Sequence, residues 1–417
     1  MTLDRPLTLH SGATLANRIA KAAMSERIAA PGGAPSRELL ALYDHWAHSG
    51  AGLLITGNVM VDPAELGETG NVAVDDERHL PGLKAWARHA KGGGATVWVQ
   101  INHPGRQAPW FLSRRPVAPS AIAMKGFGSQ FFAKPRELHE DEIWGIVHRF
   151  ARTASILETA GFDGVQIHGA HGYLISQFLS PITNQRTDEW GGSPERRRRF
   201  LLEVIRAIRS EVSPSFAVAL KLNSADFQRG GFSEEESMAV VSVLDGKGLD
   251  LLEVSGGTYE TAAMMTEPKA QSTRAREAFF LEYAEKVRSR TRVPLMVTGG
   301  FRSSRGMRDA LDSGAVDVVG IARPLAIEPD LPRRLLADET SRARSIQLAT
   351  GFKNLDTMIQ GSWYQAQLER MSQGRVPDPK AGRLLPVLRY FLPREGHPID
   401  APETRQGRAG CQISSEA

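Results

Sequence analysis

Two histidines and a tyrosine lie close together in the segment His168-Gly-Ala-His171-Gly-Tyr173, which directly follows an apolar run of strand length. Neutral imidazole N–H groups that converge on one oxygen stabilise a developing negative charge, and a phenol beside them can donate a proton. Two imidazoles also suggest a metal site, but no acidic residue close in sequence completes the ligand set. A histidine buried for structural reasons would account for one of the two imidazoles but not for both. The segment therefore indicates an oxyanion-type site, with a metal site as the alternative.

A second group of residues suits a phosphate. The turn Gly299-Gly300-Phe301 leads into a predicted helix, and Ala322-Arg323 follows the next apolar run. Glycine lets backbone N–H groups approach an anion, a helix N-terminus adds partial positive charge, and an arginine supplies a charged fork. A plain tight turn would also explain the glycine pair. Together the two turns favour an anion site.

Lys221 ends the apolar stretch FAVALKLN. A lysine buried in such a stretch needs an electrostatic partner. Three interpretations are open at this point. Lys221 is a Schiff-base nucleophile, a fixed charge that faces an anionic cofactor, or a lysine whose stem is buried while its ammonium reaches water.

The spacing of apolar runs predicts the scaffold that must position these groups. Eight runs alternate with amphipathic helical stretches, and they cover residues 19–24, 53–57, 96–101, 164–168, 217–222, 251–254, 295–298 and 316–321. This βα alternation is typical of a parallel sheet. A closed barrel absorbs eight strands without leaving an edge, so we expect an α/β fold, a (β/α)8 TIM barrel. Active sites of such barrels lie at the carboxyl ends of the strands, where all three groups fall.

The remaining segments are expected to decorate this barrel. Residues 3–15 predict a hairpin around Ser11-Gly12 that plugs its lower mouth, and residues 104–138 predict a long loop over its top. Beyond the barrel domain, residues 1–335, lies an extension, residues 336–417, that is predicted to be helical over 345–374 and then irregular. Its tail is expected either to pack on its own barrel or to reach a neighbouring copy.

Composition excludes several classes of protein. The 417 residues carry 51 Lys+Arg against 47 Asp+Glu, a net charge of +4, and 41% are hydrophobic, so a disordered chain is excluded. Cys411 is the only cysteine, which rules out an intramolecular disulfide and suits a cytoplasmic location. The run Arg196–Arg199 is predicted to be a solvated helix face rather than a nucleic-acid site. No apolar run reaches ~18 residues, so no membrane span is expected. A small-molecule substrate is the expected binding partner, and assembly into a homo-oligomer stays open.

Several segments together resemble the Old Yellow Enzyme family of FMN-dependent NAD(P)H:flavin oxidoreductases and ene-reductases. The most specific is GFDGVQIHGAHGYLISQFLSPITNQRTDEWGGSPERRRRF at 161–200, supported by ANRIAKAAMS at 16–25, VQINHPGRQ at 99–107 and DLLEVSGG at 250–257. The resemblance spans about residues 3–335. It implies an FMN enzyme that takes hydride from NADH or NADPH and reduces the activated C=C bond of α,β-unsaturated carbonyl compounds.

The resemblance also implies roles for individual residues. It implies cofactor contacts from Ala22, Ala23, Met24, Ser25, Gly57, Gln100, Lys221, Gly299, Gly300, Phe301, Ala322 and Arg323. Ser25 would lie near the flavin C4 carbonyl, Gln100 at the pyrimidine edge, and Lys221 opposite N1 and the C2 carbonyl, where most relatives carry arginine. Substrate contacts would come from Asn102, His168, His171 and Tyr259. In this scheme the two histidines bind the substrate carbonyl and Tyr173 protonates the α-carbon.

The chain departs from the family pattern at a few positions. Ala23 stands where proline is usual, and Asn102 and Arg27 stand where some relatives place aromatic residues that shape the pocket. A lysine at position 221 keeps the charge of an arginine but loses its bidentate contact. The physiological substrate and the choice between NADH and NADPH therefore stay open, as does the role of residues 336–417.

Overall fold

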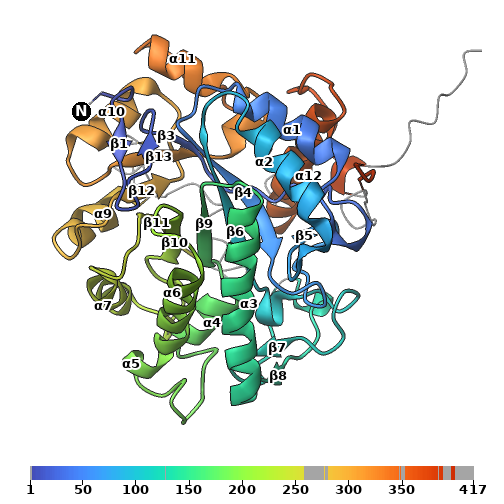
Figure 1. The fold of residues 1–417 in the computed structure, drawn as a ribbon, viewed down its shortest axis with the longest axis vertical. Helices are drawn as coiled ribbons and strands as arrows, with labels where there is room; N and C mark the ends of the chain where they lie inside the picture. The colour runs from blue at the N-terminus through green and yellow to red at the C-terminus, as the bar shows by residue number, and fades with distance from the viewer. Residues whose placement is uncertain are drawn as a thin grey trace, which may run out of the picture.

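Eight parallel strands form a closed barrel in this computed structural model, which describes residues 2–126, 128–257, 277, 280–346, 348, 353–383, 385–387 and 396–399 (Figure 1). The strands are β3 (Ile19–Lys21), β4 (Leu53–Met60), β6 (Thr96–Asn102), β9 (Gly164–Gly169), β10 (Ala217–Asn223), β11 (Leu251–Ser255), β12 (Leu295–Thr298) and β13 (Val318–Ile321). The ring closes because β3 pairs in parallel with both β13 and β4. A short strand, β5 (Val72–Ala73), pairs with the end of β4. All eight predicted strands and the barrel are confirmed.

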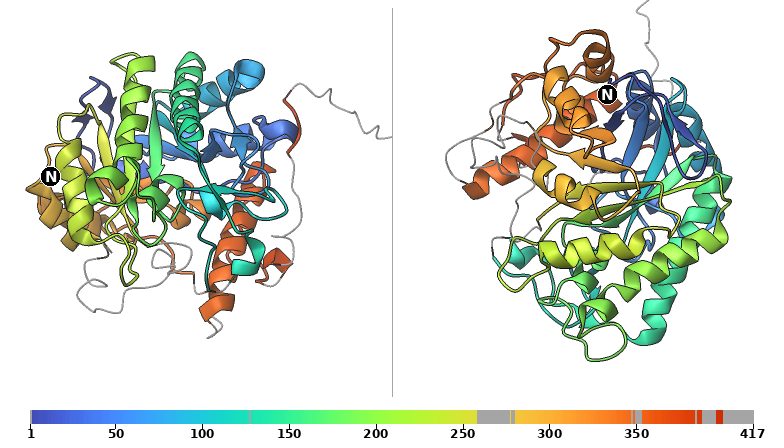
Figure 2. Two further views of the ribbon diagram at one scale, coloured as in Figure 1. Left: turned by 90° about the horizontal axis from the view of Figure 1, so that it is seen from below. Right: turned by 90° about the vertical axis from the view of Figure 1, so that its left-hand side faces the viewer.

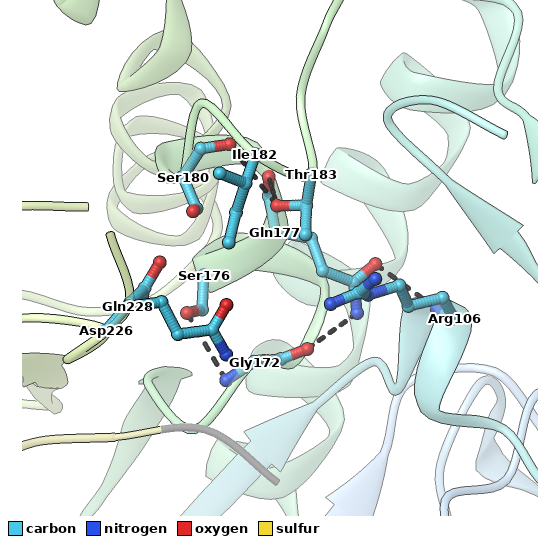
Figure 3. A pocket seen from close by; sticks show the side chains of 9 residues that line it. All are labelled: Arg106, Gly172, Ser176, Gln177, Ser180, Ile182, Thr183, Asp226 and Gln228. Carbon is cyan, nitrogen blue, oxygen red and sulfur yellow. Dashed lines mark hydrogen bonds between the residues drawn. The ribbon is translucent and has the colours of Figure 1, made fainter. Parts of the chain in front are cut away.

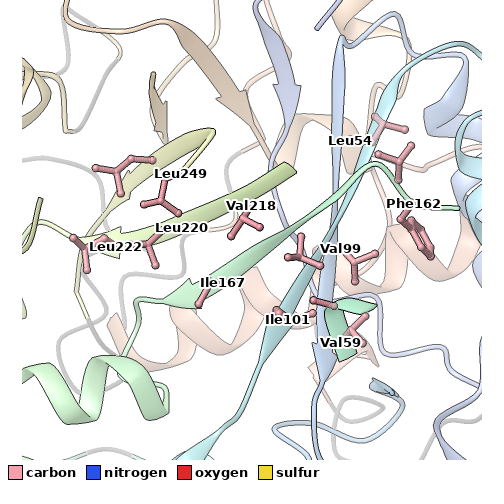
Figure 4. Close-up of a cluster of buried hydrophobic side chains, with 14 of the residues drawn as sticks. Leu54, Val59, Val99, Ile101, Phe162, Ile167, Val218, Leu220, Leu222 and Leu249 are labelled. Atoms are coloured by element: carbon pink, nitrogen blue, oxygen red, sulfur yellow. The ribbon is translucent and has the colours of Figure 1, made fainter. Parts of the chain in front are cut away.

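Side chains along each strand alternate between the two faces of the barrel wall. Val218, Leu220 and Leu222 of β10 belong to the outer core between strands and helices, part of which Figure 4 shows. Ala217 and Ala219 instead join an inner apolar cluster with residues of the other strands. This period of two is the reason why polar residues near the carboxyl ends of the strands project into the barrel.

The predicted hairpin closes the amino end of the barrel. It consists of β1 (Leu7–Thr8) and β2 (Thr14–Leu15), which pair antiparallel around Gly12, whose φ is +84°. Leu9 and Leu15 pack into the inner apolar cluster, and the backbone N–H of Ser11 donates to Oδ1 of Asp250 at 2.7 Å. The expected plug is therefore confirmed.

Helices cover the outside of the barrel between successive strands (Figures 1 and 2). They are α1 (Arg37–Ala47), α2 (Leu80–Ala90), α3 (Glu140–Thr159), α4 (Leu174–Leu179), α5 (Pro194–Arg197), α6 (Arg199–Glu211), α7 (Glu234–Leu244), α9 (Leu281–Arg288), α10 (Ser304–Asp312) and α11 (Leu331–Ala337). At the start of α7, Ser233 accepts a hydrogen bond from the backbone N–H of Glu236, and the Glu236 side chain returns to the Ser233 backbone. This pair forms a capping box.

The prediction that Arg196–Arg199 form a solvated face is wrong for Arg197. Arg197 is buried, and it donates to the carbonyls of Leu179 at 2.9 Å and Gly192 at 2.8 Å and pairs with Glu236. Arg199 lies over the Trp190 ring, 4.5 Å from its centroid. These arginines join α4, α5 and α7, so the run stabilises the loops after β9.

The segment 104–138 crosses from β6 to α3 with little regular structure, as predicted. It contains two short strands that the sequence pattern did not reveal, β7 (Val117–Ala118) and β8 (Arg136–Glu137). They pair with each other in parallel rather than with the barrel. The loop is therefore ordered by its own small sheet.

The extension beyond the barrel contains one long helix. The prediction of a helix over 345–374 is wrong at its start, because α12 spans Lys353–Ser372 and residues 343–346 are not helical. Ile359 and Trp363 of α12 form a small apolar cluster with Ile327 and Leu348. In the described part of the tail, the backbone N–H of Gly396 donates to Ala29 at 2.8 Å, so this part packs on its own barrel. Within the described residues, no helix has the length and hydropathy of a membrane span.

Candidate active site

The structure brings nearly all the predicted site residues to one end of the barrel. Ala22–Ser25 follow β3, Gly57 lies in β4, Gln100 and Asn102 in β6, and Lys221 in β10. His168, His171 and Tyr173 lie at the end of β9 and in the turn after it, whereas Gly299–Phe301 follow β12 and Ala322 and Arg323 follow β13. Because all strands are parallel, these positions share the carboxyl face. Tyr259 falls outside the described residues.

The two histidines and the tyrosine form one cluster. The ring centroids of His168 and His171 are 5.1 Å apart, and those of His168 and Tyr173 are 4.7 Å apart, both in edge-to-face arrangements. His168 and Tyr173 are 3% and 4% exposed, respectively. The sequence therefore predicted correctly that these three side chains lie together.

Burial keeps both imidazoles neutral. It lowers the pKa of His168 well below 6.5, and the nearby His171 and the Lys221 ammonium lower it further. Burial and Lys221 likewise lower the pKa of His171 well below 6.5. The backbone N–H of Ala170 donates to Nδ1 of His168 at 3.3 Å, which places the ring proton on Nε2. His168 thus offers a neutral N–H donor on its other nitrogen.

His171 is held by two residues, Asn223 and Ser255, that had no predicted role. Its Nε2 lies 2.7 Å from the Ser255 hydroxyl, and its backbone N–H donates to Oδ1 of Asn223 at 3.2 Å. The backbone of His171 has φ +61°, in the left-handed region, so the Asn223 contact holds an unfavourable turn. Both partners face the barrel interior at the ends of β10 and β11, and that position is the signal that could have identified them.

Glutamine side chains pin the turn that carries His171 and Tyr173. Nε2 of Gln177 donates to the carbonyls of Gly172 at 2.7 Å and Pro104 at 3.0 Å, and Nε2 of Gln107 donates to the carbonyl of His171 at 3.1 Å. Figure 3 shows Gln177 beside Gly172 and Arg106 at a polar cavity of about 10 Å³, which suits one water molecule. These hydrogen bonds fasten the turn to α4 and to the loop after β6.

Asn58 reaches the phenol of Tyr173 from β4, which is separated from β9 only by β6. Its Nδ2 donates to the Tyr173 oxygen at 3.4 Å. The sequence placed Asn58 at the end of a strand but assigned it no function. The contact orients a proton donor toward the space above the barrel.

A ladder of polar side chains forms the floor of this space. Nε2 of Gln100 donates to Oε1 of Gln166 at 2.7 Å, and Nε2 of Gln166 donates to Oε2 of Glu253 at 2.7 Å. The other carboxylate oxygen of Glu253 lies 3.0 Å from Nζ of Lys221, and both side chains are buried.

The burial of Lys221 decides between its predicted roles. The interpretation of Lys221 as a lysine whose ammonium reaches water is wrong. Its ion pair also argues against a Schiff-base nucleophile, because a lysine amine must be neutral to attack a carbonyl.

A carboxylate of the protein lies at the turn between β12 and α10, where the phosphate site is predicted. The carboxylate of Glu277 already accepts from the backbone N–H groups of Arg302 at 3.0 Å and Ser303 at 2.8 Å, and from the Ser303 hydroxyl. The helix itself is capped by Ser303, whose hydroxyl accepts from the backbone N–H of Gly306 at 3.1 Å. Gly299 and Gly300, with φ values of +112° and +94°, lie before this cap.

Two arginines remain available for an anion beside this glycine turn. Among the described residues, no carboxylate lies within 4.0 Å of the guanidinium of either Arg302 or Arg323. Burial lowers the pKa of Arg302, and the like charge of Arg323 lowers it further. Glu277 acts on the pKa of Arg302 in the opposite direction, although its carboxylate does not pair with the guanidinium. Two neighbouring guanidinium groups suit a phosphate group. Arg302 was not among the predicted contacts, although it directly follows the glycine turn.

Several buried polar atoms near the carboxyl ends of the strands lack a partner within the described part of the chain. They are Oδ1 of Asn58, Nδ2 and Oδ1 of Asn102, and Oγ1 of Thr298. Unsatisfied polar atoms are rare in protein interiors and point to a bound group. A planar, hydrogen-bonding ring with a phosphate tail fits this distribution, so the residues present suit FMN. No cluster of metal-ligating side chains occurs in the described residues.

Two predicted ring contacts have additional partners within the protein. Ser25 donates its hydroxyl proton to the Glu68 carboxylate. A Cβ at Gly57 would lie 2.3 Å from the carbonyl oxygen of Met24 and still closer to Glu26. Gly57 is therefore required by packing of the chain against itself.

Comparison with known proteins identifies the family. The model of the NADH:flavin oxidoreductase / NADH oxidase family matches residues 2–340. The chain is 41% identical over 356 residues to the NADH-dependent flavin oxidoreductase iliE of Hypocrea jecorina (strain QM6a), covering 79% of this chain and 88% of that protein. The chain belongs to the NADH:flavin oxidoreductase / NADH oxidase family.

Solved structures of Old Yellow Enzyme relatives have the same barrel fold as this chain. A morphinone reductase in complex with tetrahydroNAD is 27% identical with a TM-score of 0.69, covering 83% of this chain and 93% of that one. The Old Yellow Enzyme homologue from Zymomonas mobilis is 25% identical with a TM-score of 0.71, covering 83% and 95%. The family confirms the expected enzyme class and its cofactors, FMN and NADH.

Proposed function

We propose that this oxidoreductase reduces the activated C=C bond of α,β-unsaturated carbonyl compounds. The observation that carries the proposal is the cluster of two neutral imidazoles and a phenol, with ring centroids about 5 Å apart, above a buried polar floor. Such a cluster can bind a carbonyl oxygen and deliver a proton at the same time.

The residues that would hold FMN divide into two sets. Ala22–Ser25, Gly57, Gln100 and Lys221 would contact the ring. Gly299–Phe301, Ala322 and Arg323 would hold the phosphate, and Arg302 adds a second cation there. When bound, FMN supplies the hydride that the β-carbon of the substrate receives.

The histidine pair would bind the substrate carbonyl. His168 presents an N–H on Nε2 because its Nδ1 already accepts from Ala170. When the Ser255 hydroxyl donates to Nε2 of His171, the ring proton lies on Nδ1 and that N–H becomes the second donor. Both donors are fixed before the substrate binds, and they stabilise the negative charge that develops on its oxygen as the β-carbon is reduced.

Tyr173 would complete the reduction. Its phenol gives a proton to the α-carbon, so the former C=C bond gains one hydride and one proton. Asn58 donates to the Tyr173 oxygen and thereby stabilises the charge left on it. Asn102 and Tyr259 remain predicted substrate contacts.

A direct test uses 2-cyclohexenone as the probe. The purified FMN enzyme, supplied with NADH without oxygen, is expected to form cyclohexanone in an amount equal to the NADH consumed. Rapid reduction of the flavin by NADH, without saturated product from cyclohexenone or other activated alkenes, would refute the proposed substrate class while leaving the family intact.

The remaining expectations stay part of the proposal. The division into a barrel, residues 1–335, and an extension, residues 336–417, is proposed as the domain organisation. A cytoplasmic location, a small-molecule substrate and the absence of nucleic-acid binding are likewise proposed. Light scattering after size-exclusion chromatography decides between a monomer and a homo-oligomer.

A further inference from the structure

The helix α12 lies beside the phosphate end of the candidate site. The family model ends at residue 340, whereas α12 covers Lys353–Ser372. The helix packs against α1 and against the turn η6 (Arg323–Ala326), as Figure 1 shows for α1. Ile359 and Trp363 anchor it through the apolar cluster with Ile327, which directly follows η6.

One side chain of α12 holds the arginine predicted to bind the phosphate. Oε1 of Gln360 accepts a hydrogen bond from Nη1 of Arg323 at 2.7 Å. A guanidinium has five N–H donors, so this contact fixes its direction and leaves donors for an anion. Fixing a long side chain in advance reduces the entropy that ligand binding must overcome.

The side chain of Gln360 carries no charge, unlike the carboxylates that usually pair with arginine. A carboxylate at position 360 would hold Arg323 equally well but would cancel its charge. A glutamine amide is neutral, so Arg323 keeps its full positive charge for a ligand. Other partly buried arginines pair with carboxylates, such as Arg209 with Asp250 and Arg288 with Asp317.

Two further residues of α12 point to the same end of the barrel. Tyr364 lies close enough to influence the pKa of Arg302, which it raises. Gln365 donates from Nε2 to the backbone carbonyl of Glu26, in the segment that directly follows Ser25. Thus α12 contacts Arg323 and the loop after β3, and its Tyr364 lies near Arg302.

We propose that α12 is part of the FMN site and that Gln360 is a positioning residue that orients Arg323 toward the FMN phosphate. This inference rests on the proposed placement of the phosphate at Arg302 and Arg323. It assigns a role to a segment beyond the matched family region.

The test compares FMN with riboflavin, which lacks the phosphate. The full-length chain, stripped of flavin, is titrated with each, and flavin fluorescence gives the two Kd values. Gln360→Leu is expected to weaken FMN binding about tenfold and to leave riboflavin binding unchanged. Gln367→Leu is the matched control, because Gln367 lies on the same helix but contacts the backbone of Asp378 instead. This control should leave both Kd values unchanged.

Further variants separate the failure of this inference from failure of the phosphate site. If Arg323→Ala leaves the ratio of the two Kd values unchanged, the placement of the phosphate is wrong. If Arg323→Ala lowers the preference for FMN but Gln360→Leu does not, the role of α12 is overturned. Gln360→Glu, which keeps the contact but neutralises Arg323, is expected to weaken FMN binding alone. It replaces Gln360→Leu should that variant not fold.

Discussion

Nζ of Lys221 lies 3.0 Å from Oε1 of Glu253, and the two side chains, on adjacent strands, are 7% and 0% exposed. A buried ion pair contributes little net stability, but removal of one partner leaves an uncompensated charge. The pair therefore matters both for folding and for the charge that the barrel presents to its cofactor.

We expect Lys221→Met to destabilise the protein by about 3–5 kcal/mol, because Glu253 is left as a buried, unpaired carboxylate. The double variant Lys221→Met/Glu253→Gln should recover most of this loss. Urea unfolding of the wild-type protein and of the two variants, at the same FMN concentration, measures these changes in the free energy of unfolding. Equal stability of the single and double variants would show that the two charges are not coupled.

Tyr173→Phe should slow alkene reduction by roughly 10²–10⁴, the range of a general acid, and leave reduction of the flavin by NADH unchanged. The fold should be retained because only the hydroxyl is removed. Stopped-flow absorbance separates the two half-reactions. Equal slowing of both would mean that Tyr173 does not act as the proton donor.

His171→Ala should raise the barrier for alkene reduction by about 3 kcal/mol, the size of one lost oxyanion donor. It should also weaken the binding of simple phenols, whose oxygen would occupy the carbonyl position. Ser255→Ala is a milder comparison, since it removes only the contact at 2.7 Å from His171. Phenol binding that is unaffected by His171→Ala would refute this assignment.

Stability should fall as the pH decreases from about 6.5 to 4. Burial lowers the pKa of His103 to about 4, and the ring accepts a hydrogen bond from the Gly105 N–H on Nδ1 at 3.1 Å, so the native state requires it neutral. The unfolded chain takes up the proton near pH 6.5, so the stability due to neutral His103 is present above that pH and lost below it. The loss reaches about 3 kcal/mol for His103. Urea unfolding across this range should show a weaker pH dependence for His103→Asn, and an unchanged slope would exclude His103 as the cause.

The sequence predicted those features that depend on local pattern. Each of the eight barrel strands has an apolar run long enough to recognise. Arg197 was misjudged because its partners lie as far away as Glu236, 39 residues along the chain. The helical pattern around it indicated only the face on which it lies.

Sequence reasoning missed those site residues whose orientation depends on how neighbouring barrel strands are aligned. Glu253 and Ser255 point inward only because β11 pairs with β10 at Lys221 and Asn223. The contact of Glu277 with the turn before α10 could not be anticipated from a glycine turn and a helix start. The contact of Gln360 with Arg323 joins the barrel to a segment without any recognisable motif.

The hairpin that closes the amino end of the barrel has a kinetic consequence. Because Leu9 and Leu15 fill that end, reactants can approach the polar floor only from the carboxyl face. The nicotinamide and the alkene must then use one opening in turn, and the oxidised dinucleotide has to depart before the second reactant arrives. Double-reciprocal plots at several fixed alkene concentrations should therefore give parallel lines, and each reactant should inhibit when present in excess.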